Sequence, residues 1–190
     1  MRFLPVAALL LLSFAACSPP AFNGVTFDPP QAAPPLRLAD STGTPFSLEA
    51  QKGKVVLVFF GYTHCPDICP TTLLDWKKAA AELGDRTRNV RFIFVSVDPE
   101  RDTPAVSQRY AARFDATFTG LSGTPAEIET LLKSWNLAAY RDGIPGDTAA
   151  VYTMSHPSQV FVIDPDGRLR LMHRAGLTPV QISADIRALL

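Results

Sequence analysis

Two thiols, Cys65 and Cys69, are the residues of this chain best suited to do chemistry. They stand four positions apart in the run His-Cys-Pro-Asp-Ile-Cys-Pro, which follows directly on the apolar residues 55–60. Two thiols at the point where a buried strand leads into a helix can form a disulfide or bind a soft metal ion together. The chain holds one further cysteine, Cys17, so the sequence assigns the chemistry to the pair.

The segment after the strand is predicted to be a helix that begins near Cys65. Pro66 suits the first turn of a helix, where its missing N–H is no loss, and Pro70 is still early enough to be tolerated. Both sulfurs would then lie at the helix N-terminus and, at positions i and i+4, on one face. The positive end of the helix dipole favours the thiolate, which is both the nucleophile and the metal ligand.

The spacing of the cysteines separates two kinds of chemistry. Thioredoxin-type redox motifs keep two residues between the cysteines, whereas three here leave room for a metal as well as for a disulfide. Two thiolates favour soft ions such as Cu(I) and, less selectively, zinc. A structural zinc needs four protein ligands, and the chain offers only His64, His156 and His173 as nitrogen donors. Two sulfurs and one imidazole therefore indicate copper, as Cu(I) or Cu(II).

The pattern of apolar residues predicts the elements that position this pair. Run 55–60 is continuously apolar, which is typical of a strand covered on both faces, and residues 90–97 are predicted to form a second buried strand. Threonine followed by proline marks three helix starts, at residues 103, 124 and 178. The helix that begins near Cys65 continues through residues 71–83, which have helical composition. Other predicted elements are a hairpin at 36–48, a weak strand at 117–121, and a hairpin of strands 159–163 and 168–173. This order predicts an α/β fold of the thioredoxin-like class, with a central mixed sheet flanked by helices and an extra N-terminal β-hairpin.

Among the three histidines, His156 is predicted to be the third ligand. It lies in the loop 153–158, directly before the strand 159–163, and in thioredoxin-like folds this loop passes over the active-site helix. His64 adjoins Cys65, so its side chain is expected to point away from the thiols, exposed to solvent or tuning the thiolate. His173 lies on the last hairpin strand and is expected to be a half-buried structural residue.

The first 35 residues are predicted to lie outside the folded domain. Residues 1–17 hold an apolar run too short to span a bilayer as a helix, which is typical of a secretory signal. The run ends in Phe-Ala-Ala-Cys, which resembles a bacterial lipoprotein signal with Cys17 as the lipidated residue; the alternative is a plain signal with an idle thiol. Residues 18–35 contain six prolines and are predicted to be an extended tether. The copper-binding domain would then span residues 36–190.

Charge and export narrow the classes of partner. Eighteen basic residues balance eighteen acidic ones. The chain therefore lacks the excess of positive charge that binds nucleic acid, and nucleic acid is not an expected partner. Export would place the protein on the periplasmic side of a bacterial membrane, held by a lipid anchor at Cys17. Because that compartment is oxidising, keeping Cys65 and Cys69 reduced would need a dedicated reductant.

The chain resembles the Sco/SenC family over residues 36–190. The resemblance is carried by residues 61–71, which include both cysteines, by the segment Val-Ser-Val-Asp-Pro-Glu-Arg-Asp-Thr-Pro at 95–104, and by the later His156. It implies a thioredoxin-like, copper-binding protein that assists assembly of the binuclear copper centre of cytochrome c oxidase, by copper delivery, thiol reduction or both. Such a protein is a metallochaperone rather than an enzyme, although it could also reduce disulfides.

The resemblance also implies roles for individual residues and partners. Cys65, Cys69 and His156 match the family's copper ligands. Asp98 matches an aspartate near the site that is linked to partner or metal handling, and it could equally be a turn residue at a strand end. The implied partners are the copper-site subunit of the oxidase and a periplasmic copper donor or thiol reductant.

Three other functions are compatible with parts of the sequence. The first is a periplasmic thiol–disulfide oxidoreductase without a metal, with Cys65 and Cys69 as the redox pair. The second is a peroxidase of the peroxiredoxin type, which needs a threonine and an arginine around one cysteine; Thr63 lies nearby, but the sequence assigns no arginine to the pocket. The third is a structural lipoprotein, which leaves the activated thiol pair unexplained.

Overall fold

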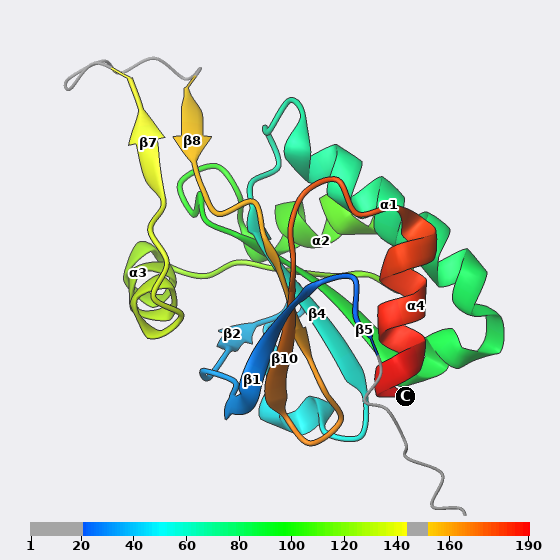
Figure 1. Cartoon of the computed structure of the whole chain (residues 1–190). Coiled ribbons are helices and arrows are strands. Elements are labelled where there is room, and N and C mark those ends of the chain that lie inside the picture. The colour runs from blue at the N-terminus through cyan, green and yellow to red at the C-terminus, as the bar shows by residue number, and fades with distance from the viewer. Residues whose placement is uncertain (1–20, 144–151) are drawn as a thin grey trace, which may run out of the picture.

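A six-stranded sheet with helices on both faces forms the centre of the computed structural model (Figure 1), which describes residues 21–143 and 152–190. The strands lie in the order β1-β10-β9-β4-β5-β6. Three of them are parallel, namely β4 (Val55–Gly61), β5 (Val90–Ser96) and β6 (Thr119–Leu121). The other three extend the sheet by antiparallel pairing, namely β9 (Val160–Ile163), β10 (Arg168–His173) and β1 (Val25–Ala32). This mixed sheet confirms the predicted α/β class.

Strands β4 and β5 lie in the middle of the sheet because their side chains are apolar on both faces. Every residue of β4 is buried, and β4 pairs with β5 in register from Val55 opposite Val90 onward. Successive side chains of a strand point to opposite faces. Leu57 therefore packs into one core, whereas Val58 packs into the other.

The two cores differ in what covers them. Three helices cover the first, namely α1 (Ile68–Leu83), α2 (Pro104–Ala112) and α4 (Pro179–Leu189). The second lies beneath α3 (Pro125–Ser134) and the hairpin of β2 (Arg37–Ala39) and β3 (Pro45–Ser47). Leu36, Leu38 and Leu48 of this hairpin region are buried in the second core, so the predicted N-terminal hairpin is confirmed.

Three of the four α-helices described begin where threonine–proline pairs predict. Thr103, Thr124 and Thr178 each accept a hydrogen bond from the backbone N–H three residues further on. In α3 and α4 the side chains of Glu127 and Gln181 in turn accept a hydrogen bond from the backbone N–H of the capping threonine, which completes a capping box.

The prediction that residues 18–35 form a tether is wrong for the part that the structure describes. Residues Val25–Ala32 form β1, which pairs with β10 at the edge of the central sheet. Pro29 and Pro30 are tolerated because β1 is an edge strand and its register shifts across them, so that the missing N–H groups interrupt no regular ladder. The fold therefore begins before residue 36.

The chain just before β1 is also fastened to the domain. The backbone N–H groups of Asn23 and Gly24 donate to the carboxylate of Asp185 on α4, at 2.8 and 2.9 Å. No helix within residues 21–143 and 152–190 is both long enough and apolar enough to cross a membrane. The predicted signal segment, residues 1–17, and the predicted lipidation site, Cys17, lie outside the described residues.

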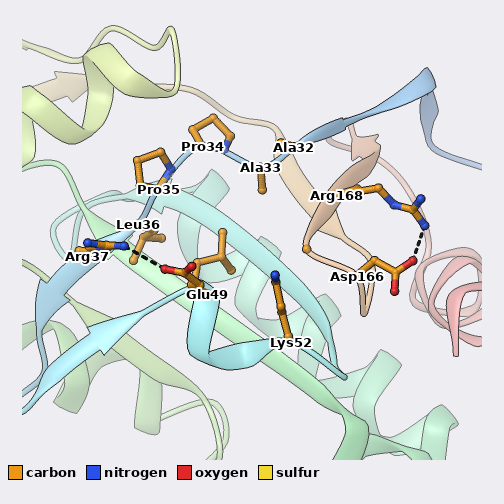
Figure 2. Close-up of a pocket in the computed structure, with 12 residues that line it drawn as sticks. Ala32, Ala33, Pro34, Pro35, Leu36, Arg37, Glu49, Lys52, Asp166 and Arg168 are labelled. Atoms are coloured by element: carbon orange, nitrogen blue, oxygen red, sulfur yellow. Dashed lines mark hydrogen bonds and ion pairs between the residues drawn. The ribbon is translucent and has the colours of Figure 1, made fainter.

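Two further features flank the central sheet. Strands β7 (Tyr140–Asp142) and β8 (Thr153–Ser155) pair with each other in a ribbon that projects beside it (Figure 1). A pocket of about 370 Å³ lies elsewhere, lined by the β1–β2 connection, Lys52 and the β9–β10 turn (Figure 2). Lys52 precedes β4 whereas the cysteines follow it, so this pocket is at the opposite end of the strand from the thiols.

Candidate metal centre

The loop between β4 and α1 carries the cysteines, but it differs from the prediction. Helix α1 begins at Ile68, so Cys65 precedes it and only Cys69 lies in its first turn. The predicted start near Cys65 is wrong because Asp67, at φ −138° and ψ −77°, lies outside the helical region. A turn forms instead, in which the N–H of Cys65 donates to the carbonyl of Tyr62 at 3.2 Å. The N–H of Cys69 still donates to the sulfur of Cys65, at 3.5 Å.

His156 joins the two thiols in one group. Its Nε2 lies 3.7 Å from Sγ of Cys69, and the potential ligand atoms of Cys65, Cys69 and His156 all lie within 4.8 Å of one another. Both cysteines are free thiols. Within residues 21–143 and 152–190, these three form the one group of histidine, cysteine or acidic side chains with metal-binding spacing.

The hydrogen bonds of His156 leave the nitrogen that faces the thiols free to act as a ligand. Its Nδ1 lies 3.0 Å from the carbonyl oxygen of Phe60 and 2.9 Å from that of Pro157. A carbonyl oxygen can only accept, so Nδ1 carries the proton and Nε2 presents its lone pair to Cys69. A hydrogen bond from the distal ring nitrogen is what commonly orients metal-binding histidines.

The walls of the site are aromatic and tightly packed. The imidazole of His156 makes edge contacts with the rings of Tyr62 and Phe59, at centroid distances of 5.4 and 6.0 Å. Gly61, the last residue of β4, lies against Cys69, and a Cβ at this position would come within 2.5 Å of Sγ. The glycine therefore lets the sulfur lie directly on the strand.

The two thiols differ in acidity. A hydrogen bond from the thiol of Cys69, with backbone N–H groups, lowers the pKa of Cys65 to about 4. Burial, together with the neighbouring Cys65, raises the pKa of Cys69. Cys65 is also the more exposed of the two, since Cys69 is fully buried. The site thus presents one thiolate to the surface and keeps one thiol beneath it.

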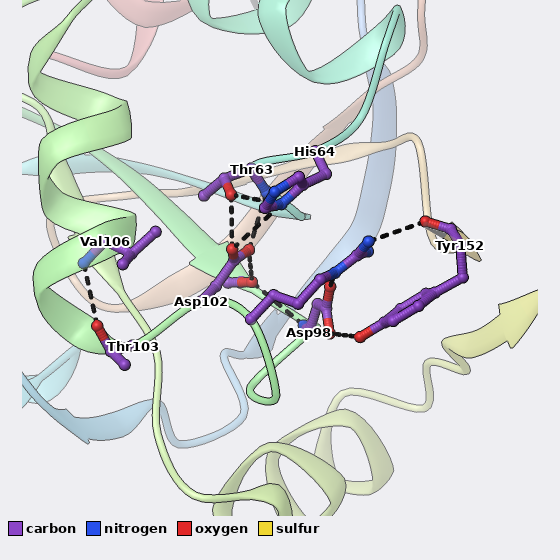
Figure 3. A network of polar contacts seen from close by, with 9 residues as sticks. Thr63, His64, Asp98, Asp102, Thr103, Val106 and Tyr152 are labelled. Atoms are coloured by element: carbon purple, nitrogen blue, oxygen red, sulfur yellow. Dashed lines mark hydrogen bonds and ion pairs between the residues drawn. The ribbon is translucent and has the colours of Figure 1, made fainter. Parts of the chain in front are cut away.

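A buried carboxylate, Asp102, holds the loop that carries the cysteines. It accepts hydrogen bonds from the N–H of Thr63 at 2.8 Å, from the hydroxyl of Thr63 at 2.5 Å and from Ser96 at 2.6 Å (Figure 3). Sequence reasoning did not identify this residue. The available signal was its place after the neighbouring parallel strand β5, because the carboxyl ends of parallel strands meet at one edge of a sheet.

The other predicted residues lie around the site rather than in it. Asp98 bonds to Arg101 and to the hydroxyl of Tyr152 and belongs to no group of ligands among the described residues. His64 is exposed, and its Nδ1 lies 3.1 Å from the hydroxyl of Thr63, as expected for a residue that points away from the thiols. His173 is structural but almost fully buried rather than half-buried, because it pairs with Asp185 at 2.9 Å.

The structure places an arginine near the thiols, but the arginine and the threonine are not arranged as in a peroxidase site. Arg101, which the sequence did not assign to the pocket, lies over the ring of Tyr62 at 5.7 Å. Its guanidinium bonds to Asp98 and to the carbonyl of Tyr152, and the hydroxyl of Thr63 donates to Asp102. Among the described residues neither group hydrogen-bonds to Cys65, as a peroxidatic site would require.

Comparisons of the sequence and of the structure with known proteins point to the same family. The sequence model of the SCO1/SenC family matches residues 26–190. The structure of copper-bound ScoI from Bradyrhizobium japonicum superimposes with a TM-score of 0.75 at 38% identity, over 84% of this chain and 99% of that one. Apo Sco1 from Thermus thermophilus gives 0.79 at 37% identity, over 90% and 98%. Both likenesses confirm the thioredoxin-like fold that the sequence predicted.

The curated relatives include longer proteins. The mitochondrial protein SCO2 of Saccharomyces cerevisiae is 35% identical over 137 residues, which make up 70% of this chain but 44% of the yeast protein. This chain therefore spans less than half the length of that relative.

Proposed function

Because the chain belongs to the SCO1/SenC family, we propose that it binds copper through Cys65, Cys69 and His156 and helps to assemble the binuclear copper centre of cytochrome c oxidase. The observation that carries this proposal is the convergence of two free thiols and one imidazole within 4.8 Å. Thiolate and imidazole are the donors that copper prefers. A relative in the same fold is named as a member of the Sco family of cytochrome c oxidase assembly proteins.

The two oxidation states of copper make different demands on this donor set. Cu(I) is satisfied by two thiolates, whereas Cu(II) favours nitrogen and oxygen donors. We therefore assign Cys65 and Cys69 to both states and His156 mainly to Cu(II). Formation of a Cys65–Cys69 disulfide would consume both thiolates and abolish binding.

Copper titration of the reduced full chain tests the site. Changing Cys17 to serine in all samples removes the third thiol. We expect one copper ion to bind per chain. His156→Ala should weaken Cu(II) by at least about tenfold while Cu(I) changes much less, and Cys65→Ser or Cys69→Ser should weaken both. His64→Ala is the matched control, since that imidazole is exposed and bonds to Thr63. If His156→Ala leaves Cu(II) binding intact, the assignment of the third ligand is wrong.

The cellular setting is part of the proposal. The lipoprotein-type end of the signal segment at Cys17 supports a lipid anchor on the periplasmic side of a bacterial membrane. The copper-site subunit of the oxidase would be the recipient, and a periplasmic protein would supply copper or electrons. Challenge of an apo oxidase copper domain with the copper-loaded chain measures delivery directly, by loss of copper from one protein and gain by the other.

The unequal thiols support a second activity, reduction of a disulfide in the recipient. Cys65 attacks the partner disulfide, forms a mixed disulfide and releases one partner thiolate. Cys69 then attacks Cys65, which releases the second partner thiolate and leaves a Cys65–Cys69 disulfide. An external dithiol reductant must restore the pair. Recovery of free thiols on an oxidised oxidase domain, in the absence of copper, distinguishes this activity from delivery.

A further inference from the structure

The position of His156 depends on a ribbon that the central sheet does not hold. His156 follows β8 directly, and among the described strands β8 pairs only with β7. A two-stranded ribbon is marginally stable by itself. The place of the imidazole is therefore set by its own hydrogen bond to the carbonyl of Phe60 together with the side chains that fasten β8 to the rest of the domain.

Tyr152, immediately before β8, makes such a contact (Figure 3). Its hydroxyl donates to Oδ1 of Asp98 at 2.6 Å, and its backbone carbonyl accepts from Nη1 of Arg101 at 3.0 Å. The guanidinium of Arg101 also lies over the Tyr152 ring at 3.5 Å and donates to the other carboxylate oxygen of Asp98. Each of the three residues thus bonds to the other two.

The two charged residues of this cluster are sheltered from water, Tyr152 is partly buried, and the cluster adjoins the site. Asp98 is 2% exposed and the side chain of Arg101 is 16% exposed, so their charge-assisted bonds are stronger than neutral ones at the surface. Arg101 lies over Tyr62, whose ring contacts the His156 imidazole. Burial and the neighbouring Asp98 raise the pKa of Tyr152 to about 12, so its hydroxyl keeps the proton that it donates.

We infer that Tyr152 is a positioning residue for His156: through its bonds to Asp98 and Arg101 it holds β8 where the imidazole faces the two thiols. This inference rests on the proposed copper site. Without the hydroxyl, β8 leaves this position for part of the time, and the apparent affinity for any metal that needs the imidazole falls with the competent fraction. The thiolates are held by α1 and its preceding loop and do not depend on Tyr152.

The test is Tyr152→Phe in the full chain with Cys17→Ser. This change removes one oxygen and leaves the ring beneath Arg101. We expect Cu(II) to bind about tenfold more weakly and Cu(I) to change less than about twofold, with loss of the nitrogen hyperfine signal in the Cu(II) spectrum. Tyr140→Phe is the matched control, because Tyr140 lies on the same ribbon, is 62% exposed and has no side-chain hydrogen bond within the described residues.

A double-mutant cycle with His156→Ala isolates the route of the effect. If Tyr152 acts through the imidazole, Tyr152→Phe has no further effect on Cu(II) affinity once His156 is alanine. Equal losses in both backgrounds, equal weakening of Cu(I), or behaviour identical to that of Tyr140→Phe would each overturn the inference.

Two further measurements complete the design. If His156→Ala alone does not weaken Cu(II), the proposed copper site fails and the inference falls with it, a result distinct from an inert Tyr152→Phe. Thermal unfolding of each variant shows whether it folds. Should Tyr152→Phe not fold, Arg101→Lys, which keeps the charge but loses the planar fork, takes its place in the double-mutant cycle. The expected and the contradicting outcomes are then the same.

Discussion

At the scale of single residues, the two sulfurs differ because one precedes a helix and the other lies within its first turn. Cys65 is reached from solvent and has the lower pKa, whereas Cys69, in the first turn of α1, is buried against Gly61 of β4. Any partner therefore meets Cys65 first, and Cys69 acts only on what Cys65 has bound.

We expect iodoacetamide to modify Cys65 first, at a rate that barely changes between pH 6 and 8. An ordinary thiol with a pKa near 8.5 reacts about tenfold faster per pH unit over this range, whereas Cys65, with a pKa of about 4, is already a thiolate. Peptide mapping by mass spectrometry gives the rate. In Cys65→Ser the buried Cys69 should react far more slowly. A Cys65 rate that rises tenfold per pH unit would contradict this prediction.

The sequence predicted the residues of the site better than the residues that hold it. Cys65, Cys69 and His156 were identified from the sequence because their types suit soft metals. The structure brings the three side chains together. Asp102 and Tyr152 were missed because their bonding partners lie 39 and 54 positions away. Aspartate and tyrosine are common residues whose positioning role is set by tertiary contacts alone.

At the scale of elements, prediction succeeded where one local signal dominated. Largely apolar runs identified β4 and β5, and threonine–proline pairs identified three helix starts. Proline misled in two places. Pro29 and Pro30 indicated a tether, but the edge of the sheet accepts them in β1. Pro66 indicated the first turn of α1, but it lies in the turn before the helix.

The contact between α4 and the N-terminal segment predicts a dependence of stability on pH. Burial raises the pKa of Asp185, but hydrogen bonds from His173, Asn23 and Gly24 outweigh it and hold the pKa below its ordinary value. Because the folded pKa is below the unfolded value of about 3.9, the carboxylate stabilises the fold above about pH 4. This contribution is lost as pH falls through the lowered folded pKa.

Asp185→Asn should therefore lower the free energy of unfolding by about 2 kcal/mol at pH 7, and the deficit should shrink as pH falls below about 4. Urea unfolding at several pH values measures both quantities. Asp85→Asn is the matched control, because Asp85 is exposed in the turn after α1 and its change should leave stability within about 0.5 kcal/mol. A deficit that stays constant down to pH 2 would show that the carboxylate charge is not its source.

At the scale of the whole molecule, the group of Cys65, Cys69 and His156 and the N-terminal strand β1 lie at separate parts of the central sheet. The cysteines follow the central strand β4, whereas β1 closes the outer edge beside β10. Without β1, the backbone of β10 would present an unpaired edge, which is a template for association with other chains. The strand therefore protects the sheet without touching the ligands.

This separation predicts different results for two truncations. Removal of residues 1–20 leaves β1 and its bonds intact and should keep the melting temperature unchanged. Removal of residues 1–35, at the boundary that the sequence predicted, also deletes β1 and the donors to Asp185 on Asn23 and Gly24. Loss of at least about 3 kcal/mol should lower the melting temperature by roughly 6–12 °C, and the exposed edge should promote dimers in size-exclusion chromatography. Copper stoichiometry should stay at one, since Cys65, Cys69 and His156 remain. Equal melting temperatures for the two truncated chains would mean that β1 contributes nothing to the fold, and the edge-strand interpretation would have to be abandoned.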